Sequence, residues 1–160
     1  MADNTATERR AHLLAASAGG SAHSVKCLAA TIEMPASSSA DTVTFGRIPS
    51  GARILPSSTI YFDDLATSGA PTLDVGLGAV NGNLVNADDP DAIGNGFTLT
   101  TANTGSSLMS EIANCGLPAW DLVASESVDP GGALKVYGTV RDAATHTAAT
   151  ISIELFYTVD

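Results

Sequence analysis

The sequence is poor in aromatic residues and in charged residues of either sign. Aromatic residues make up 5% and charged residues 15% of the 160 residues, whereas a typical soluble domain carries about 25% charged residues. The core must therefore come from Val, Ile, Leu and Ala, and one domain of this length can bury such a core. A surface rich in Ser, Thr, Asn and Gly favours packing against other protein subunits over life as a free monomer.

Basic residues are missing from the middle of the chain. No Lys or Arg lies between Arg53 and Lys135, but ten acids do, and the remaining seven acids balance the seven bases. The net charge of -10 therefore belongs to this middle segment. Nucleic-acid binding requires a cationic surface, so we expect no nucleic-acid partner. Two interpretations of these acids remain open. Either they keep the protein soluble, or the middle segment faces solvent while the charge-balanced segments before and after it face a partner.

Cysteine is scarce and long apolar runs are absent. Cys27 and Cys115 show no CxxC or metal-ligand spacing, and two thiols in a chain of this size are typical of a reducing compartment. No stretch approaches the ~20 apolar residues that cross a bilayer, and the run "HLLAASA" is too short for a signal peptide. We expect no membrane partner and synthesis in a cytoplasm.

The first 25 residues differ in composition from the rest. They are rich in Ala, Ser and Gly, with one weak helical patch at 11–16, so they bury little apolar surface and would cost entropy to order alone. This stretch is either a frayed terminus or an arm that orders on a neighbouring subunit. We predict an N-terminal arm over 1–25 and one β-sandwich domain over 26–160.

From residue 26 onward, apolar and polar residues alternate with the period of half-buried strands. The last run, "TISIELFYTVD", is the clearest, because every second residue from Ile151 to Val159 is apolar. Similar runs are "CLAATIEM", "VTFGRI", "RILPSSTIYF", "PTLDVGL", "GFTLT", "AWDLVAS" and "ALKVYGTV". About eight such strands predict an all-β, jelly-roll-like antiparallel sandwich.

Three connecting segments are predicted from turn and cap residues. Pro49-Ser50-Gly51 indicates a type I turn between two strands, with Pro49 at the first central position and Gly51 at the last. The best helix candidate is Ser107–Ala113, which ends before Asn114 and Gly116. The segment Val80–Gly96 is predicted to be a long polar loop.

The sequence contains no motif with the residue types and spacing of a catalytic, phosphate-binding or zinc site. The glycines of "GLGAVNG" lack the spacing of a phosphate-binding loop, and no G-x-S-x-G motif is present. His12, His23 and His146 are scattered without zinc-ligand spacing. Asp63 and Asp64 are adjacent in a strand terminus and would point to opposite faces. We therefore expect neither an enzyme nor a bound cofactor.

Two features leave a binding role open. "DDPDAIG" resembles the start of a calcium loop at Asp89 and Asp91, but Ile93 and Thr100 occupy later ligand positions. A solvated loop is favoured there, and whether loop 80–96 holds a cation stays open. Trp120 suits either stacking on a sugar or core packing, and its place in an alternating run favours the core.

Four segments together resemble a family of small tailed-phage proteins. They are "RIPSGARILPSSTIYFDD", "PTLDVGL", a polar loop containing "DDPDAI", and the terminal "ISIELFYTVD". The family is that of capsid decoration (cement, or auxiliary head) proteins, commonly encoded beside the major capsid protein. The resemblance spans 41–160, and Pro49-Ser50-Gly51-Ala52-Arg53 matches the family's Pro-x-Gly-Ala-Arg corner in full.

This resemblance implies a virion protein without catalytic residues. A jelly-roll-like body, often trimeric, would be made in a bacterial host cytoplasm and would bind the major capsid protein on the outer capsid surface between capsomers. Candidate capsid contacts are Arg9, Arg10, Arg47 and Arg53, most of the cations, which an acidic partner would attract; equally, they solvate strand ends. The alternatives are a tail, head-fibre or head–tail connector component, and a carbohydrate-binding or hydrolytic sandwich that uses Trp120 and the loop acids.

Overall fold

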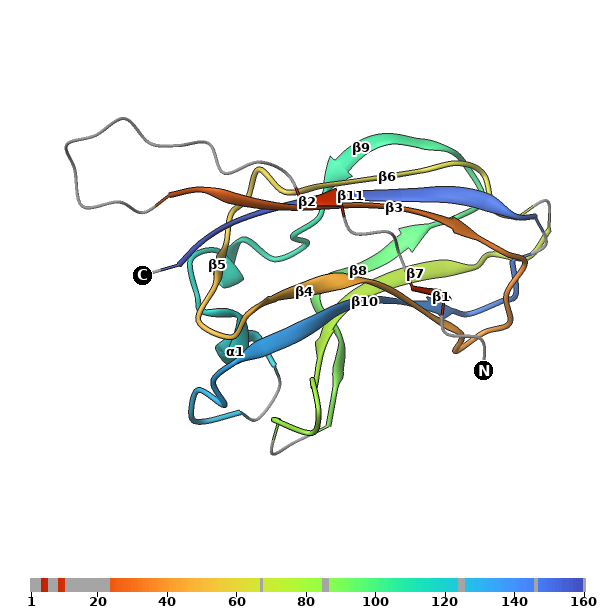
Figure 1. Cartoon of the computed structure of the whole chain (residues 1–160). Helices are drawn as coiled ribbons and strands as arrows, with labels where there is room; N and C mark the ends of the chain where they lie inside the picture. Colours follow the sequence, from red (N-terminus) through yellow and green to blue (C-terminus); the bar gives the residue numbers. More distant parts are fainter. Residues whose placement is uncertain are drawn as a thin grey trace.

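The protein is described by a computed structural model that covers residues 4–5, 9–10, 24–66, 68–84, 87–123, 126–145 and 147–159. Within these ranges the chain forms two facing β-sheets and two short helical turns (Figure 1). The strands are β1 (Asn4–Thr5), β2 (Arg9–Arg10), β3 (Lys26–Met34), β4 (Thr42–Pro49), β5 (Arg53–Ile54), β6 (Thr59–Phe62), β7 (Thr72–Gly78), β8 (Asp89–Thr98), β9 (Asn103–Ser107), β10 (Ala133–Arg141) and β11 (Ala149–Thr158). The helical turns are the 3-10 turn η1 (Ile112–Asn114) and the helix α1 (Ala119–Leu122).

The strand order is that of a jelly roll. Sheet A has the order β1-β4-β10-β7-β8, and sheet B has the order β2-β3-β11-β6-β9, with β5 pairing beside β11. Without β1, β2 and the short β5, each sheet keeps four strands, and the chain passes from β3 in sheet B to β4 in sheet A. These strands pair in antiparallel fashion, whereas β1 runs parallel to β4. The predicted all-β jelly-roll-like sandwich is confirmed.

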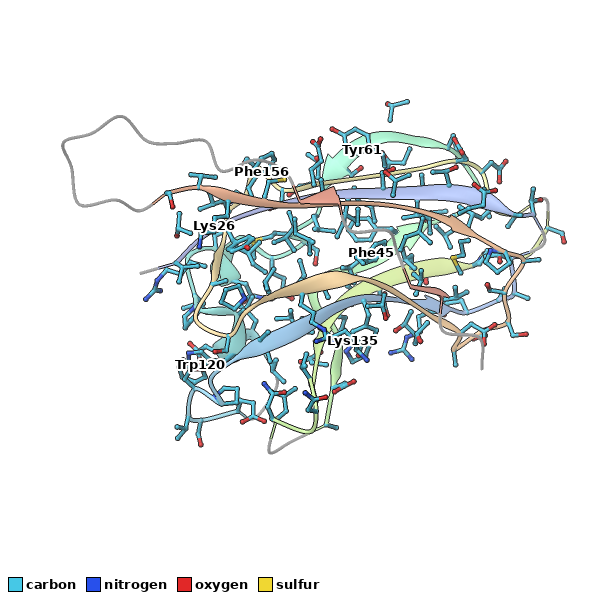
Figure 2. The ribbon with its side chains drawn as sticks, in the orientation of Figure 1. Lys26, Phe45, Tyr61, Trp120, Lys135 and Phe156 are labelled. Carbon is cyan, nitrogen blue, oxygen red and sulfur yellow. The ribbon has the colours of Figure 1, made fainter. Side chains whose placement is uncertain are left out.

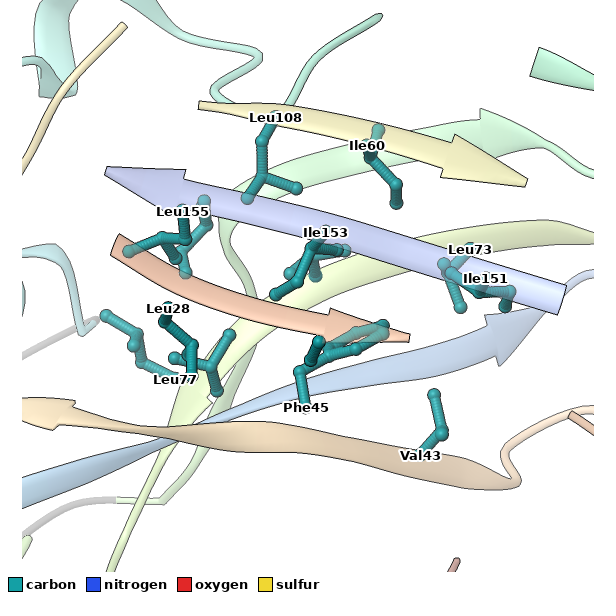
Figure 3. Close-up of a cluster of buried hydrophobic side chains, with 14 of the residues drawn as sticks. Leu28, Val43, Phe45, Ile60, Leu73, Leu77, Leu108, Ile151, Ile153 and Leu155 are labelled. Atoms are coloured by element: carbon teal, nitrogen blue, oxygen red, sulfur yellow. The ribbon is translucent and has the colours of Figure 1, made fainter. Parts of the chain in front are cut away.

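The core lies between the two sheets and follows the period-two pattern. In β3 the residues Leu28, Ala30, Ile32 and Met34 are buried, and in β11 the residues Ile151, Ile153 and Leu155 are buried while those between them are more exposed. Figure 3 shows side chains of sheet B, such as Ile153, opposite Phe45 and Leu73 of sheet A. Burying each such side chain contributes about 1.5–3 kcal/mol, so the alternation selects one face of each strand.

The turn after β4 differs from its prediction in register and in role. The backbone N–H of Ala52 donates to the carbonyl oxygen of Pro49 at 3.0 Å. Pro49 is therefore the first residue of the turn and Gly51 the third, whereas the prediction made them the second and the fourth. The turn carries the chain from β4 in sheet A to β5 in sheet B, so it forms a corner between the sheets.

The predicted helix over Ser107–Ala113 is wrong. Ser107 ends β9, and η1 is the only helical turn that follows before residue 115 in this described segment. The N–H of Leu108 donates to the carbonyl of Ser58 at 2.8 Å, and that of Ser110 donates to Ile93 at 3.2 Å. Ser107 pairs with Thr59 of β6, and these tertiary hydrogen bonds hold the backbone that follows it in a non-helical conformation.

The predicted strand over "AWDLVAS" is also wrong, because its first four residues form α1. The first N–H groups of a helix have no partner inside the helix. Here the N–H of Ala119 donates to Ala52 at 2.7 Å and that of Trp120 donates to Ser50 at 3.0 Å. The corner carbonyls therefore complete the start of α1.

The predicted loop Val80–Gly96 contains the first part of β8. This strand begins at Asp89 and pairs with β7, but the register shifts twice along the pair. Such irregularities interrupt the side-chain alternation that identifies a strand in sequence. The run "GFTLT" is strand only to Thr98, and the polar strand β9 was not predicted.

Candidate functional site

The Pro49–Arg53 corner is fixed by contacts with two other segments. Ser50 is buried, and its N–H donates to Gly132 at 3.0 Å. Arg53 donates through Nη1 to the carbonyl oxygen of Gly116 at 2.5 Å. The corner thus holds the segments before α1 and before β10 at one end of the sandwich, and this explains the motif structurally.

The four predicted arginines come from three different strands. Arg9 and Arg10 form β2 and pair with Ala29 and Leu28 of β3, while their side chains lie outside the described part of the chain. Arg53 belongs to β5 and serves the corner. Of the two whose side chains are described, Arg47 lies in sheet A and Arg53 in sheet B.

Arg47 of β4 is exposed, whereas Arg53 is half-buried. It lies directly opposite Lys135 of β10 in the antiparallel register, and like charges in that arrangement are destabilising. Lys135 turns to Asp88, with Nζ 3.4 Å from Oδ2 and 4.6 Å from the centroid of the Tyr137 ring. Arg47 has no carboxylate partner within the described ranges, so an acidic partner surface would relieve the repulsion.

Arg47 belongs to the outer face of sheet A, formed with alternate residues of β10 (Lys135, Tyr137, Thr139 and Arg141). Figure 2 shows Lys135 and Phe156 on opposite sheets of the sandwich. Arg141 is paired with Asp74, Nε to Oδ2, at 3.0 Å. The hydroxyl of Thr139 is buried and has no hydrogen-bond partner among the described residues. We call this the sheet A face. Tyr137 and Thr139 are buried in it, so its candidate contact residue is the exposed Arg47.

Tyr137 keeps its proton on this face. Burial raises the pKa of its hydroxyl far above the ordinary value, and the carboxylates of Asp88 and Asp89 raise that pKa further. The Arg141 guanidinium acts in the opposite direction. Tyr137 is therefore a neutral, largely apolar part of the sheet A face.

This pKa makes stability depend on alkaline pH. Because the folded pKa is raised, the contribution of Tyr137 is fully present below the unfolded pKa of about 10 and is lost as pH rises above it. We expect the free energy of unfolding to fall above about pH 10, and to fall less steeply in Tyr137→Phe. Urea titrations across this range measure both slopes, and equal slopes would contradict the assignment.

The acids of segment 80–96 stabilise turns and pair with a base. Asp88 accepts hydrogen bonds from the N–H of Ala79 at 2.7 Å and from Lys135. Asp91 accepts from the side-chain amide of Asn95 at 3.2 Å. In the part of the chain that the structure describes, no three His, Cys, Asp or Glu side chains group as metal ligands do. Asp88 and Asp91 thus have hydrogen-bonding roles within the chain, and Asp89 and Asp91 lie in β8 and not in the predicted loop.

The remaining candidate residues have structural surroundings. Asp63 accepts from the N–H of Thr150 at 3.4 Å and Asp64 from that of Ala66 at 3.0 Å, both just after β6. Trp120 is half-buried and packs against the hydrophobic core. Each of these groups thus has a local packing or hydrogen-bonding role.

The remaining sequence predictions concern the histidines, the cysteines and a membrane span. His12, His23 and His146 lie outside the described residues. Cys27 and Cys115 are free thiols, and burial, followed by the Glu154 carboxylate, raises the pKa of Cys27. None of the helices in the described ranges has the length and apolar content that spanning a bilayer requires.

Comparison with known proteins finds the fold in solved structures. No family model and no curated protein matches the sequence. A chain from the capsid of Ralstonia phage GP4 superposes with a TM-score of 0.66 at 21% identity, covering 89% of this chain and 88% of that chain. A chain from the capsid asymmetric unit of cyanophage Pam1 gives 0.57 at 23% identity, covering 92% and 93%. The sandwich is shared with chains of two phage capsids.

Proposed function

We propose that this protein is a structural virion component, a capsid decoration (cement) protein that binds the outer surface of a phage head between capsomers. The observation that carries the proposal is the fold likeness to chains in two phage capsids, which covers 88–93% of each chain. The motif resemblance over 41–160 supports the same role.

The proposed partners are the major capsid protein and further copies of this chain, with a trimer as the assembly. A low-charge surface and a structurally fixed corner suit adhesion rather than turnover. Interfaces of about 800 Å² per partner, repeated around a shell, would add to its cohesion without any chemistry. We accordingly propose a protein without enzymatic activity or cofactor.

The proposal is tested on particles of the encoding phage. Quantitative mass spectrometry of purified virions should give an abundance comparable to that of the major shell subunit. Purified chain added to expanded shells that lack it should cosediment with them to saturation and raise their disruption temperature. An abundance far below that of the shell subunit would favour the connector, tail or head-fibre alternative, and shells that gain no heat tolerance would contradict a cement role.

Substitution of Arg47 tests the proposed interface most directly. We expect Arg47→Glu to weaken shell binding about tenfold, equivalent to about 1.4 kcal/mol. Its thermal stability should be unchanged or slightly higher, because the repulsion with Lys135 is removed. Lys26→Glu carries the same charge change in sheet B and is the matched control. Equal weakening in both variants would show a general charge effect and remove Arg47 from the proposed interface.

A further inference from the structure

One side of the sandwich places two sheet edges together. β3 is the edge of the sheet B body, β4 is the edge of the sheet A body, and the two strands contact each other across the layers (Figure 1). In the described residues, both edges are covered only by the two-residue strands of the arm. Asn4 and Thr5 pair with Val43 and Thr44 of β4, and β2 pairs with Leu28 and Ala29 of β3.

The edge of β3 has less protection against pairing with another chain than the edge of β8. Its nine residues contain no proline, its two charged residues, Lys26 and Glu33, lie at or near its ends, and its pairing with β11 continues without a register shift. The opposite edge of sheet A is different, because β8 carries Pro90 and the exposed Asp91 and pairs irregularly. Prolines, charges and bulges are the devices that blunt an edge. The β3 edge therefore depends on a covering strand.

The chain between β2 and β3 is longer than a local connection needs. β2 ends at Arg10 and β3 begins at Lys26, which leaves 15 residues between them (26 - 10 - 1). Antiparallel neighbours are usually joined by about 2–5 residues. Fifteen residues can extend to about 50 Å, so the same connection can reach the equivalent edges of an adjacent molecule.

The energetic difference between exchange and self-closure lies in the interface between copies. Each two-residue strand adds only a few backbone hydrogen bonds, worth about 1 kcal/mol each. Ordering each arm residue costs about 1–2 kcal/mol, so closure of the arm on its own body is marginal. In a closed ring every pairing is kept, and the interface between copies is added to it.

We propose that β1 and β2 are exchanged between copies, pairing with β4 and β3 of a neighbouring molecule in the register seen within one chain. This inference rests on the association of copies proposed above. It identifies the arm as the element that joins them and a second copy of this chain as its partner.

The test uses cross-strand cysteines in a Cys27→Ser, Cys115→Ser background. One chain carries Arg9→Cys and the other, isotopically labelled, carries Ala29→Cys, because these positions are opposite in the register and opposed Cβ atoms lie within disulfide reach. The chains are refolded together, oxidised mildly and weighed by intact mass spectrometry. Exchange predicts a disulfide-linked dimer that contains one chain of each kind.

The matched control replaces Ala29→Cys by Thr31→Cys, on the same face of β3 but two residues out of register, and should give little mixed dimer. A chain carrying both Arg9→Cys and Ala29→Cys should form interchain links. If it forms only an intrachain disulfide, the arm covers its own edges and exchange is wrong. If neither link forms, the arm does not occupy the β3 edge, which also overturns the proposal.

The mass in solution separates this inference from the association itself. Light scattering should show an oligomer for the intact chain and a smaller species after removal of residues 1–23, with circular dichroism confirming that the shortened chain is folded. A persistent oligomer with intrachain links only would refute exchange and leave association standing. A monomeric intact chain would refute association between copies, and exchange with it, while shell binding would still be decided by cosedimentation.

Discussion

Phe45→Ala is expected to lower the free energy of unfolding by about 3–5 kcal/mol, as truncations of buried aromatic rings do. Phe45 is 0% exposed and is among the largest fully buried side chains of the described residues. Its ring fills the space between the sheets (Figure 3). Gly138 of the neighbouring strand leaves room for it, since a Cβ there would lie 3.1 Å from the ring. The loss therefore combines transfer of the ring and a cavity that the two sheets cannot close.

Phe156→Ala is the matched control for Phe45→Ala. It removes the same atoms from the outer side of β11, where the ring is only half-buried. We expect a loss of about 1 kcal/mol, because little apolar surface is returned to water. Equilibrium denaturation in urea measures both variants. Losses of equal size would show that the core does not lie between the sheets as described.

Gly76→Ala is expected to detach β8 from β7 and to cost about 3 kcal/mol or more, at or above the upper end for overpacked sites. A Cβ at Gly76 would overlap the carbonyl oxygen of Asp89 and would lie 2.6 Å from the Cα of Pro90. Both obstacles are backbone atoms, so no side-chain rotation relieves the overlap. The strand itself must move, and the edge of sheet A moves with it.

Gly51→Ala provides the comparison, because a Cβ at Gly51 would meet its nearest neighbour, Oδ2 of Asp129, at an ordinary 3.9 Å. We expect its stability to change by less than about 1 kcal/mol. Hydrogen exchange locates the effect, with faster exchange of β8 amides in Gly76→Ala and unchanged exchange in Gly51→Ala. Unaltered β8 protection in Gly76→Ala would contradict the close approach of the two strands.

Several elements were predictable because one face of a strand determines its side-chain pattern. β3 and β11 each bury alternate residues, and that alternation is visible in "CLAATIEM" and "TISIELFYTVD". Their number and their turn residues were enough to predict an all-β sandwich. The first part of β8 escaped prediction, since its register shifts place unlike residues on one face.

The helix and the strand that were wrongly predicted between β9 and β10 have a related explanation. Local preference favoured a helix over Ser107–Ala113 and a strand over "AWDLVAS". The carbonyls of Ser58, Ser50 and Ala52 attract these backbone N–H groups into other conformations. Those carbonyls come from segments more than 40 residues away in the chain, so no local pattern reports them.

The candidate site was also predictable only in part. The sequence supplied four arginines without ranking them. Only the fold separates Arg53, bonded to Gly116, from Arg47, exposed opposite Lys135. That difference depends on a carbonyl and a register brought in by other strands.

By itself, then, the sequence determined that this chain is a β-sandwich with a distinct N-terminal stretch and without a recognisable reactive motif. These properties follow from residue order and composition, because the alternation of apolar and polar residues decides which face of each strand is buried. The tertiary structure alone decided the corner between the sheets, the exposed cation on the sheet A face and the two edges that the arm covers. Each of those depends on which distant strands become neighbours, and that is a property of the folded molecule as a whole.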